Sequence, residues 1–217
     1  MVMSKKINRP VILDYGSGNI RSVVKAFENV NGGRVLSTNN PSELANASHI
    51  ILPGVGAFAD CKIGLLAFSG LVNGLIEQVI EKRKPFLGIC VGMQVMATLG
   101  REHGETHGFD WIQGQIVKIK PDDIDLKIPH MGWNELVFHE TIHPVLSGLD
   151  AASHAYFAHS YCFETVDPKH VLASVEYGGL ITAIVGRDNL IGTQFHPEKS
   201  QRVGLQFIEN FLNWDGT

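Results

Sequence analysis

The first ninety residues alternate between short apolar runs and amphipathic stretches. The apolar run at residues 11–13 leads into a glycine-containing turn at 16–18, and the apolar side chains between Ile20 and Val30 then recur at helical spacing behind Asn19, a candidate helix cap. The same pattern predicts strands at 34–37, 50–52 and 85–87 and helices at 41–45 and 62–84. Strand–helix–strand units build parallel sheets with helices on both faces. The predicted fold class is α/β, with a mostly parallel central sheet flanked by helices.

The pattern changes after Trp111 to shorter alternating segments, which are typical of antiparallel strands. These segments lie at 115–119, 133–138, 155–163, 171–176, 181–185 and 190–195. A closing helix is predicted at 203–213. Because no linker, repeat or low-complexity tract interrupts the chain, we expect a single domain over residues 1–217 with its core at about 10–214.

Composition excludes several classes of protein. Hydrophobic residues make up 44% and charged residues 18% of the chain, and this charged share is below the typical value of about 25%, so we expect a dry core rather than disorder. The net charge is −4, and Lys and Arg form no stripe, which argues against a nucleic-acid partner. The apolar run at 11–13 is too short for a signal segment or a membrane span, so we expect no membrane association.

The cysteines and histidines give no metal or redox signature. Cys61, Cys90 and Cys162 lie far apart without a C-x-x-C pair, which favours a reducing, cytoplasmic setting. His103 and His107 have helical spacing, but the glycines beside them oppose a helix and no third ligand is near in sequence. We therefore expect no metal and no other cofactor.

The sharpest local signal is Gly88-Ile89-Cys90-Val91-Gly92, where a buried strand meets a helix predicted at 93–99. A nucleophile elbow needs a strained turn that lifts one side chain off the sheet, and flanking glycines give the backbone room for it. A helix N-terminus favours a thiolate, and the amide of Val91 would point at the oxygen of a tetrahedral intermediate. The alternative is that Cys90 is a buried structural cysteine. The motif by itself favours neither the catalytic nor the structural interpretation.

A base for this cysteine is available in His196-Pro197-Glu198, after the last predicted strand. An imidazole can take the proton of a thiol, and a carboxylate can hold the imidazole in one tautomer. Positions i and i+2 of an extended segment face the same side, so His196 and Glu198 would be presented together. Alone, the tripeptide is more typical of a surface turn. Together with the elbow, in the order Cys, His, Glu, it predicts a catalytic triad.

Two further glycine-containing loops follow predicted strands. Pro53-Gly54-Val55-Gly56 lies at the carboxyl end of a strand, where ligands bind in doubly wound sheets, and its peptides can turn toward an oxyanion. A tight turn without a catalytic role is an equal alternative for this stretch. Gly16-Ser17-Gly18 lacks the third glycine of a dinucleotide loop, so we interpret it as a helix entry and expect no nucleotide site.

Cys90 with its flanking glycines, Gln94 and the tripeptide 196–198 resemble the class I, triad-type glutamine amidotransferases. Within that class, several stretches in the correct order resemble the glutaminase subunits of imidazole glycerol phosphate synthases. These stretches are 14–19, 21–23, 53–58, 130–135, 157–161 and 196–200. The resemblance covers the whole chain. It implies the flavodoxin-like fold of that class, with an additional antiparallel strand region in the C-terminal half.

The resemblance also implies a role for each matched residue. Cys90 would form the glutamyl thioester, His196 would act as acid and base, and Glu198 would orient His196. The groups that hold the oxyanion would be Gly54, Val55, Gly56 and Val91. The groups that bind glutamine would be Gly56, Gln94, Glu102, His159, Ser160 and Tyr161. The positions that face a partner would be Ser17, Asn19, Trp133, Tyr156 and Lys199, of which Ser17 stands where the family varies.

In that family the glutaminase works with a separate (β/α)8-barrel cyclase in histidine biosynthesis. The resemblance implies a heterodimer in which ammonia from L-glutamine passes to the cyclase, which makes imidazole glycerol phosphate and AICAR. A barrel of that kind takes about 250 residues, so this chain of 217 residues does not contain it. Low activity alone and stimulation by the ligand-bound cyclase are expected, with a flip of the 54–56 peptides as the switch.

Three other functions remain open at this point. A paralogous glutaminase subunit could supply ammonia to an amidotransferase that modifies surface sugars. A catalytically silent scaffold could dock a barrel without turning over glutamine, although the intact Cys90, His196 and Glu198 argue against it. A flavodoxin-like binding module would carry flavin, which absorbance would reveal.

Overall fold

The computed structural model describes residues 8–16, 19–123, 125–139 and 143–217. The larger sheet consists of β1 (Pro10–Leu13), β2 (Leu36–Thr38), β3 (His49–Gly54), β4 (Phe86–Cys90), β8 (His130–Phe138), β9 (His154–His159), β11 (Val171–Glu176), β12 (Leu180–Arg187) and β13 (Leu190–Thr193). The smaller sheet consists of β5 (Leu99–Gly100), β6 (Thr106–His107), β7 (Gly114–Lys118) and β10 (Tyr161–Thr165). Among the described residues the strand orders are β2-β1-β3-β4-β13-β12-β11-β8-β9 and β10-β7-β5-β6.

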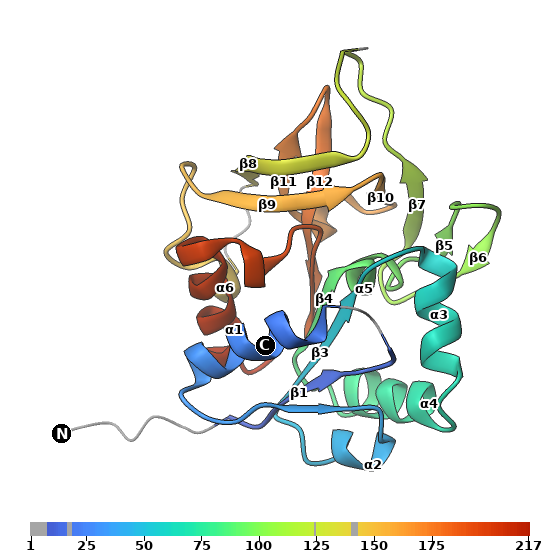
Figure 1. Cartoon of the computed structure of the whole chain (residues 1–217), viewed down its shortest axis with the longest axis vertical. Coiled ribbons are helices and arrows are strands. Elements are labelled where there is room, and N and C mark those ends of the chain that lie inside the picture. The colour runs from blue at the N-terminus through green and yellow to red at the C-terminus, as the bar shows by residue number, and fades with distance from the viewer. Residues whose placement is uncertain (1–7, 17–18, 124, 140–142) are drawn as a thin grey trace.

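The helices cover the parallel part of the larger sheet. They are α1 (Ile20–Asn31), α2 (Pro41–Leu44), α3 (Phe58–Leu66), α4 (Leu71–Ile76), α5 (Val91–Gln94) and α6 (Gln201–Asn213), and the π-helix η1 (Glu77–Glu81) continues α4. Short 3-10 turns are η2 (Pro144–Leu146), η3 (Pro168–His170) and η4 (Pro197–Lys199). In Figure 1, α1 and α6 lie on one side of β1, β3 and β4, and α3 and α4 lie on the other. Every residue of β1, β3 and β4 is buried, as expected for strands covered on both faces.

The sheet confirms the predicted α/β class and its division into two parts. Strands β2, β1, β3, β4 and β13 are parallel neighbours, whereas β12, β11, β8 and β9 continue the sheet in antiparallel pairs. The prediction for 190–195 was right in part, because β13 runs antiparallel to β12, as expected, but parallel to β4. Alternation of apolar side chains does not encode strand direction. The parallel pairing brings the chain that follows β13 to the same edge as the end of β4.

The predicted helix at 62–84 is interrupted. Gly70 adopts a left-handed φ of 77°, and the chain bends by 101° between α3 and the helical stretch Leu71–Glu81. Within the described part of the chain, no single helix is long and apolar enough to cross a membrane, and only this bent pair passes that test of length and composition. Glycine adopts this conformation without the strain that a side chain would cause, so Gly70 ends the helix.

Two further elements differ from expectation at the edge of the sheet. The helix predicted at 93–99 is the four-residue α5, after which Met96 donates to the carbonyl of Met93 in a tighter turn. The strand predicted at 155–163 is divided at Ser160, where the chain leaves β9 of one sheet and enters β10 of the other. The carbonyl of Ser160 accepts from the amide of Ile119, so this crossing is tied to the smaller sheet.

Helix α6 packs closely on the turn η4. A Cβ added at Gly204 would lie 1.9 Å from the carbonyl oxygen of Pro197, so only glycine allows this approach. Phe207 and Phe211 bury the same face of the helix, and the Phe207 ring meets Phe195 edge to face at 5.7 Å between centroids. The segment that follows β13 is therefore held between the sheet and α6.

A histidine pair joins β8 to β9. His130 lies directly opposite His159 across the two strands, with 3.0 Å between His130 Nδ1 and His159 Nε2. His159 Nδ1 donates to the carbonyl of Tyr161 (2.9 Å), so its Nε2 is the acceptor for His130. Burial lowers the pKa of each imidazole to about 4. Both rings are thus neutral at pH 7.

We expect Gly204→Ala to lower the free energy of unfolding by about 1–3 kcal/mol, the usual cost of overpacking. Helix propensity alone predicts the opposite, a gain of about 1 kcal/mol. Gly33→Ala is the control, because a Cβ there meets nothing within 4 Å. Urea unfolding monitored by circular dichroism measures both variants. A Gly204 variant as stable as the wild type would contradict the close packing of α6 on η4.

The histidine pair predicts a loss of stability in acid. Because the pKa of His159 is lowered to about 4 in the folded state, its contribution is fully present above the unfolded pKa of about 6.5 and is lost as the pH falls towards 4. We expect His159→Gln, whose amide keeps one donor and one acceptor, to reduce this acid dependence by up to about 3 kcal/mol. Urea unfolding between pH 7 and 4.5 measures it, with exposed His154→Gln as control. The same dependence of stability on pH in the wild type, His159→Gln and His154→Gln would refute the assignment of this acid sensitivity to His159.

Candidate active site

Cys90 lies at the end of β4 in a strained backbone conformation. Its φ is 54° and its ψ is −112°, outside the regions that side-chain-bearing residues normally occupy. The turn lies against β3, since a Cβ added at Gly92 would be 1.8 Å from the carbonyl oxygen of Leu52. This close approach gives the elbow the form of a nucleophile turn. The helix that follows has only four residues, so the elbow rather than a long helix dipole distinguishes Cys90.

The predicted oxyanion segment lies beside this elbow. Gly54 is the parallel-strand partner of Cys90, which places the end of β3 next to the end of β4. Val55 and Gly56 then follow, and Gly56 has a φ of 89° with nothing within 4 Å of the position of an added Cβ. Together with Val91, this loop brings several backbone amides to the neighbourhood of Cys90.

His196 and Glu198 approach the elbow from the far side of β4. The Nδ1 atom of His196 donates to Oε1 of Glu198 at 2.9 Å, and the two side chains are 5% and 1% exposed. The prediction of an extended segment at 196–198 was wrong, because the backbone amide of Lys199 donates to the carbonyl of His196 and closes the turn η4. The backbone amide of His196 donates to the carbonyl of Tyr156 in β9, and the Ser200 hydroxyl donates to the His196 carbonyl. The turn, not strand alternation, brings the imidazole and the carboxylate together.

The pKa of His196 is raised to about 9. Burial alone lowers it, but hydrogen bonds to Cys90 and Glu198 and the charges of those two groups outweigh the burial. Imidazolium is therefore the main form at pH 7, paired with a carboxylate on one side and with the sulfur on the other. This arrangement can stabilise a thiolate and supply a proton to a leaving group.

A cavity of about 320 Å³ opens at Cys90 and brings most of the predicted site together. Its lining includes the predicted residues Val55, Gly56, Cys90, Val91, Gln94, Glu102, His159, Ser160, Tyr161, His196 and Lys199. The chain crossing at Ser160 is part of the wall. Gly54 and Glu198 are not in the lining and lie behind it, adjacent to Cys90 and His196.

The lining that contains Gln94 and Glu102 is polar. The amide of Gln94 donates to the Tyr161 carbonyl (3.2 Å) and to Oε1 of Gln194 (3.0 Å). Glu102 is half-buried, and its Oε2 accepts from the amide of Phe58 at the start of α3 (2.8 Å). One carboxylate, backbone groups and side-chain amides therefore line the cavity on the side where a charged amino-acid head group could be bound.

Sequence reasoning missed several residues of this cavity. Pro129, Met131 and Ala158 complete the lining. Gln194 is fully buried, and its amide donates to Cys90 Sγ at 3.5 Å. Only its place two residues before His196 could have drawn attention to Gln194, because a single glutamine just after a strand carries no motif of its own.

Three of the residues expected to face a partner form one cluster. Trp133 and Tyr156 are cross-strand partners in β8 and β9, with ring centroids 6.1 Å apart, and the Lys199 ammonium lies 5.6 Å from the Tyr156 ring. Trp133 is 46% exposed.

The other two residues expected to face a partner are Ser17 and Asn19. Ser17 lies outside the described residues. Asn19 is used differently: its side chain does not cap α1, contrary to expectation, and instead donates to Oε1 of Glu198 at 2.7 Å.

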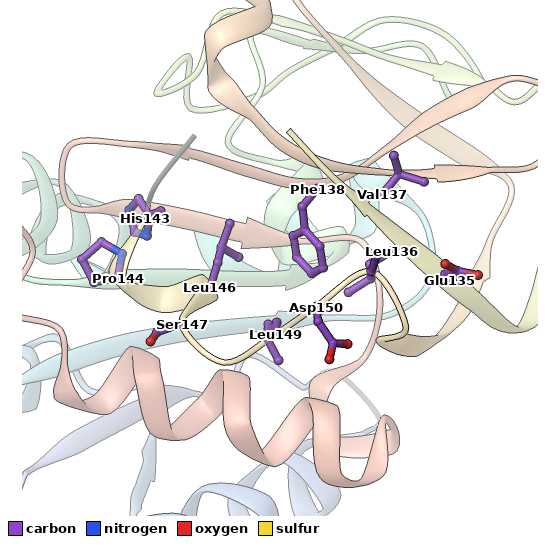
Figure 2. Close-up of a pocket in the computed structure, with 11 residues that line it drawn as sticks. Glu135, Leu136, Val137, Phe138, His143, Pro144, Leu146, Ser147, Leu149 and Asp150 are labelled. Atoms are coloured by element: carbon purple, nitrogen blue, oxygen red, sulfur yellow. The ribbon is translucent and has the colours of Figure 1, made fainter. Parts of the chain in front are cut away.

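A larger cavity, of about 750 Å³, lies between β8 and the segment 143–151. Figure 2 shows Leu136, Phe138, Leu146 and Leu149 around it. None of the predicted site residues lines it. Size alone does not make it the active site, because the perturbed histidine, the strained cysteine and their carboxylate all lie at the smaller cavity.

Comparison with known proteins identifies the family of this chain. Residues 11–214 match the family Glutamine amidotransferase class-I. The imidazole glycerol phosphate synthase subunit HisH of Rhodopseudomonas palustris is 53% identical over 213 residues, 94% of this chain and 97% of that protein. The corresponding subunit of Cereibacter sphaeroides is 51% identical over 208 residues, 94% of this chain and 98% of that protein.

A solved structure shows the same fold at low sequence identity. A crystal structure of a glutamine amidotransferase superposes with a TM-score of 0.71, covering 94% of this chain and 99% of the other at 17% identity. This likeness concerns the fold alone, whereas the sequence matches extend over nearly the whole chain. The chain therefore belongs to the class-I glutamine amidotransferase family and, within it, to the imidazole glycerol phosphate synthase subunits named HisH.

Proposed function

We propose that the protein hydrolyses L-glutamine to glutamate and ammonia through Cys90, His196 and Glu198. The observation that carries this proposal is the convergence of the strained cysteine and the His196–Glu198 pair on one cavity. Family membership supports the same chemistry, since class-I glutamine amidotransferases are the proteins that this chain matches over residues 11–214.

The first half of the reaction forms a thioester. The Cys90 thiolate attacks the carboxamide carbon of glutamine, and the carbonyl oxygen takes up negative charge. The imidazolium of His196, whose pKa is raised to about 9, then donates its proton to the leaving nitrogen. The C–N bond breaks and ammonia is released. Glu198 keeps the positive ring in place through Nδ1 and stabilises its charge.

The second half returns the enzyme to its starting state. Neutral His196 takes a proton from water, which attacks the thioester carbon. The C–S bond breaks, glutamate leaves, and the thiolate and imidazolium are restored. In both halves the oxyanion is held by backbone amides of the 54–56 loop and of Val91, which line the site or adjoin Cys90.

The remaining polar lining binds the amino-acid head of glutamine. Glu102 pairs with the α-ammonium group, because its Oε2 is already occupied by the Phe58 amide and its other oxygen is available to a ligand. Gly56, Gln94 and the segment His159-Ser160-Tyr161 complete the binding site. The histidine pair holds this segment by the bond from His159 to the Tyr161 carbonyl.

The ammonia passes to a (β/α)8-barrel cyclase, with which the protein forms a heterodimer in histidine biosynthesis. The relatives' description as synthase subunits supports a partner. The exposed Trp133, with Tyr156 and Lys199, provides an aromatic surface beside the cavity for that partner. The open space around Gly56 permits the peptide flip that couples cyclase ligation to glutaminase activity. We place this single-domain subunit in the cytoplasm, because Cys61, Cys90 and Cys162 are all free thiols.

We expect Cys90→Ala to abolish glutamate release from glutamine, because no nucleophile remains to form the thioester. The measurement compares the chain alone with the chain plus a histidine-pathway cyclase and its nucleotide ligand. Cys162→Ala is the control, since that thiol lies outside the cavity lining. Strong stimulation that the Cys90 variant lacks supports the whole proposal. Activity without stimulation points to another synthase, such as one that modifies surface sugars, and activity in neither state supports a silent scaffold.

We expect Glu102→Gln to raise KM for glutamine about tenfold or more and to leave kcat nearly unchanged. The amide oxygen of glutamine at this position can still accept from Phe58, so the fold is preserved while the charge that binds the ammonium is lost. Steady-state glutaminase kinetics in the complex measures the effect, with exposed Glu105→Gln as control. A change confined to kcat would show that Glu102 does not bind the substrate head.

A further inference from the structure

The position of Asn19 is unusual for a residue at the start of a helix. Asparagine at this position normally accepts a bond from a backbone amide of the first turn. Here the side chain makes no such cap, and α1 begins without one. The amide nitrogen of Asn19 instead donates to Glu198 across 179 positions of sequence, at 2.7 Å. A bond of this kind is made at the expense of the local cap, which indicates a function other than helix initiation.

Two donors among the described residues converge on one oxygen of Glu198. Oε1 accepts from Nδ1 of His196 at 2.9 Å and from Nδ2 of Asn19 at 2.7 Å. The Glu198 side chain is 1% exposed, so water does not compete for this atom. A carboxylate cannot donate, which defines the orientation of the asparagine amide. With two donors from different directions, the carboxylate has one orientation relative to the imidazole.

We propose that Asn19 is a positioning residue for the triad, which holds the Glu198 carboxylate in line with His196. This inference rests on the proposed glutaminase function and deepens it. The sequence predicted Asn19 as a helix cap and, through the family resemblance, as a residue that faces a partner. Its side chain ties the start of α1 to the triad, so that a displacement of Asn19 would act first on Glu198, then on His196 and last on the Cys90 sulfur.

A double-mutant cycle tests whether Asn19 acts through Glu198. We expect Asn19→Ala to lower kcat about tenfold, as for loss of a hydrogen bond to a charged group, with KM within about twofold. In a Glu198→Ala background the same change should alter kcat less than about twofold. Asn19→Ser, which retains a good helix cap but is too short to reach Glu198, should behave like Asn19→Ala. Asn31→Ala at the other end of α1 is the control and should leave kcat unchanged.

The kinetics are measured at saturating cyclase, and the affinity for the cyclase is measured separately by calorimetry. A purely interfacial Asn19 would weaken cyclase binding and leave kcat at saturation intact, which would overturn the proposal. An equal loss in both backgrounds, or full activity of Asn19→Ser, would also overturn it.

Alkylation of Cys90 by iodoacetamide gives a readout that does not depend on glutamine turnover. Peptide mass spectrometry separates Cys90 from Cys61 and Cys162. Loss of the Asn19 bond should slow alkylation about tenfold in the chain alone, and not in the Glu198→Ala background. Unchanged alkylation in Asn19→Ala would refute the positioning role. If the wild-type complex released no glutamate, the glutaminase proposal would fail while alkylation still tested the role of Asn19.

Discussion

The strained backbone at Cys90 is the constraint on which the rest of the site depends. A residue with a side chain at φ 54° and ψ −112° is held in a conformation that costs on the order of 1–3 kcal/mol, so the surroundings must impose it. They do so through the close contact of Gly92 with the carbonyl of Leu52, which packs the turn against β3. The same contact brings the end of β3 beside the sulfur, so one packing requirement shapes both the nucleophile and the proposed oxyanion loop.

The acid–base side of the site is built from elements distant in sequence. The chain that follows β13 is bonded to β9 through Tyr156 and Ser200, covered by α6 at Gly204, and reached by α1 through Asn19. Together these contacts fix the position of the turn that carries His196 and Glu198. The pKa of His196 is raised although burial lowers it, because this arrangement holds the imidazole in hydrogen bonds with both Cys90 and Glu198.

Much of the fold and the site could be predicted, and the failures have a common cause. The buried strands and the elbow motif are local patterns, so residues such as Cys90 and His196 were identified from sequence. The errors concern the break at Gly70, the division at Ser160, the direction of β13 and the turn after His196. Apolar periodicity encodes neither strand direction nor backbone conformation: distant pairing decides the division at Ser160 and the direction of β13, whereas the break at Gly70 and the turn after His196 are local conformations. Gln194 and Asn19 acquire their partners only through long-range contacts.

The sequence by itself determined the α/β class, the candidate nucleophile Cys90 with its flanking glycines, the His–Pro–Glu tripeptide and the resemblance to glutamine amidotransferases. Periodicity and motif spacing are local properties of the chain, which is why these features could be recognised without a structure. Only the tertiary structure decided that β13 runs parallel to β4. Because β13 and β3 flank β4 on opposite sides, His196 reaches Cys90 from the side of β4 that faces away from β3. The tertiary structure also decided that the Asn19 side chain donates to Glu198 and does not cap α1. This hydrogen bond joins atoms that meet only after the sheet, α1 and η4 have packed together.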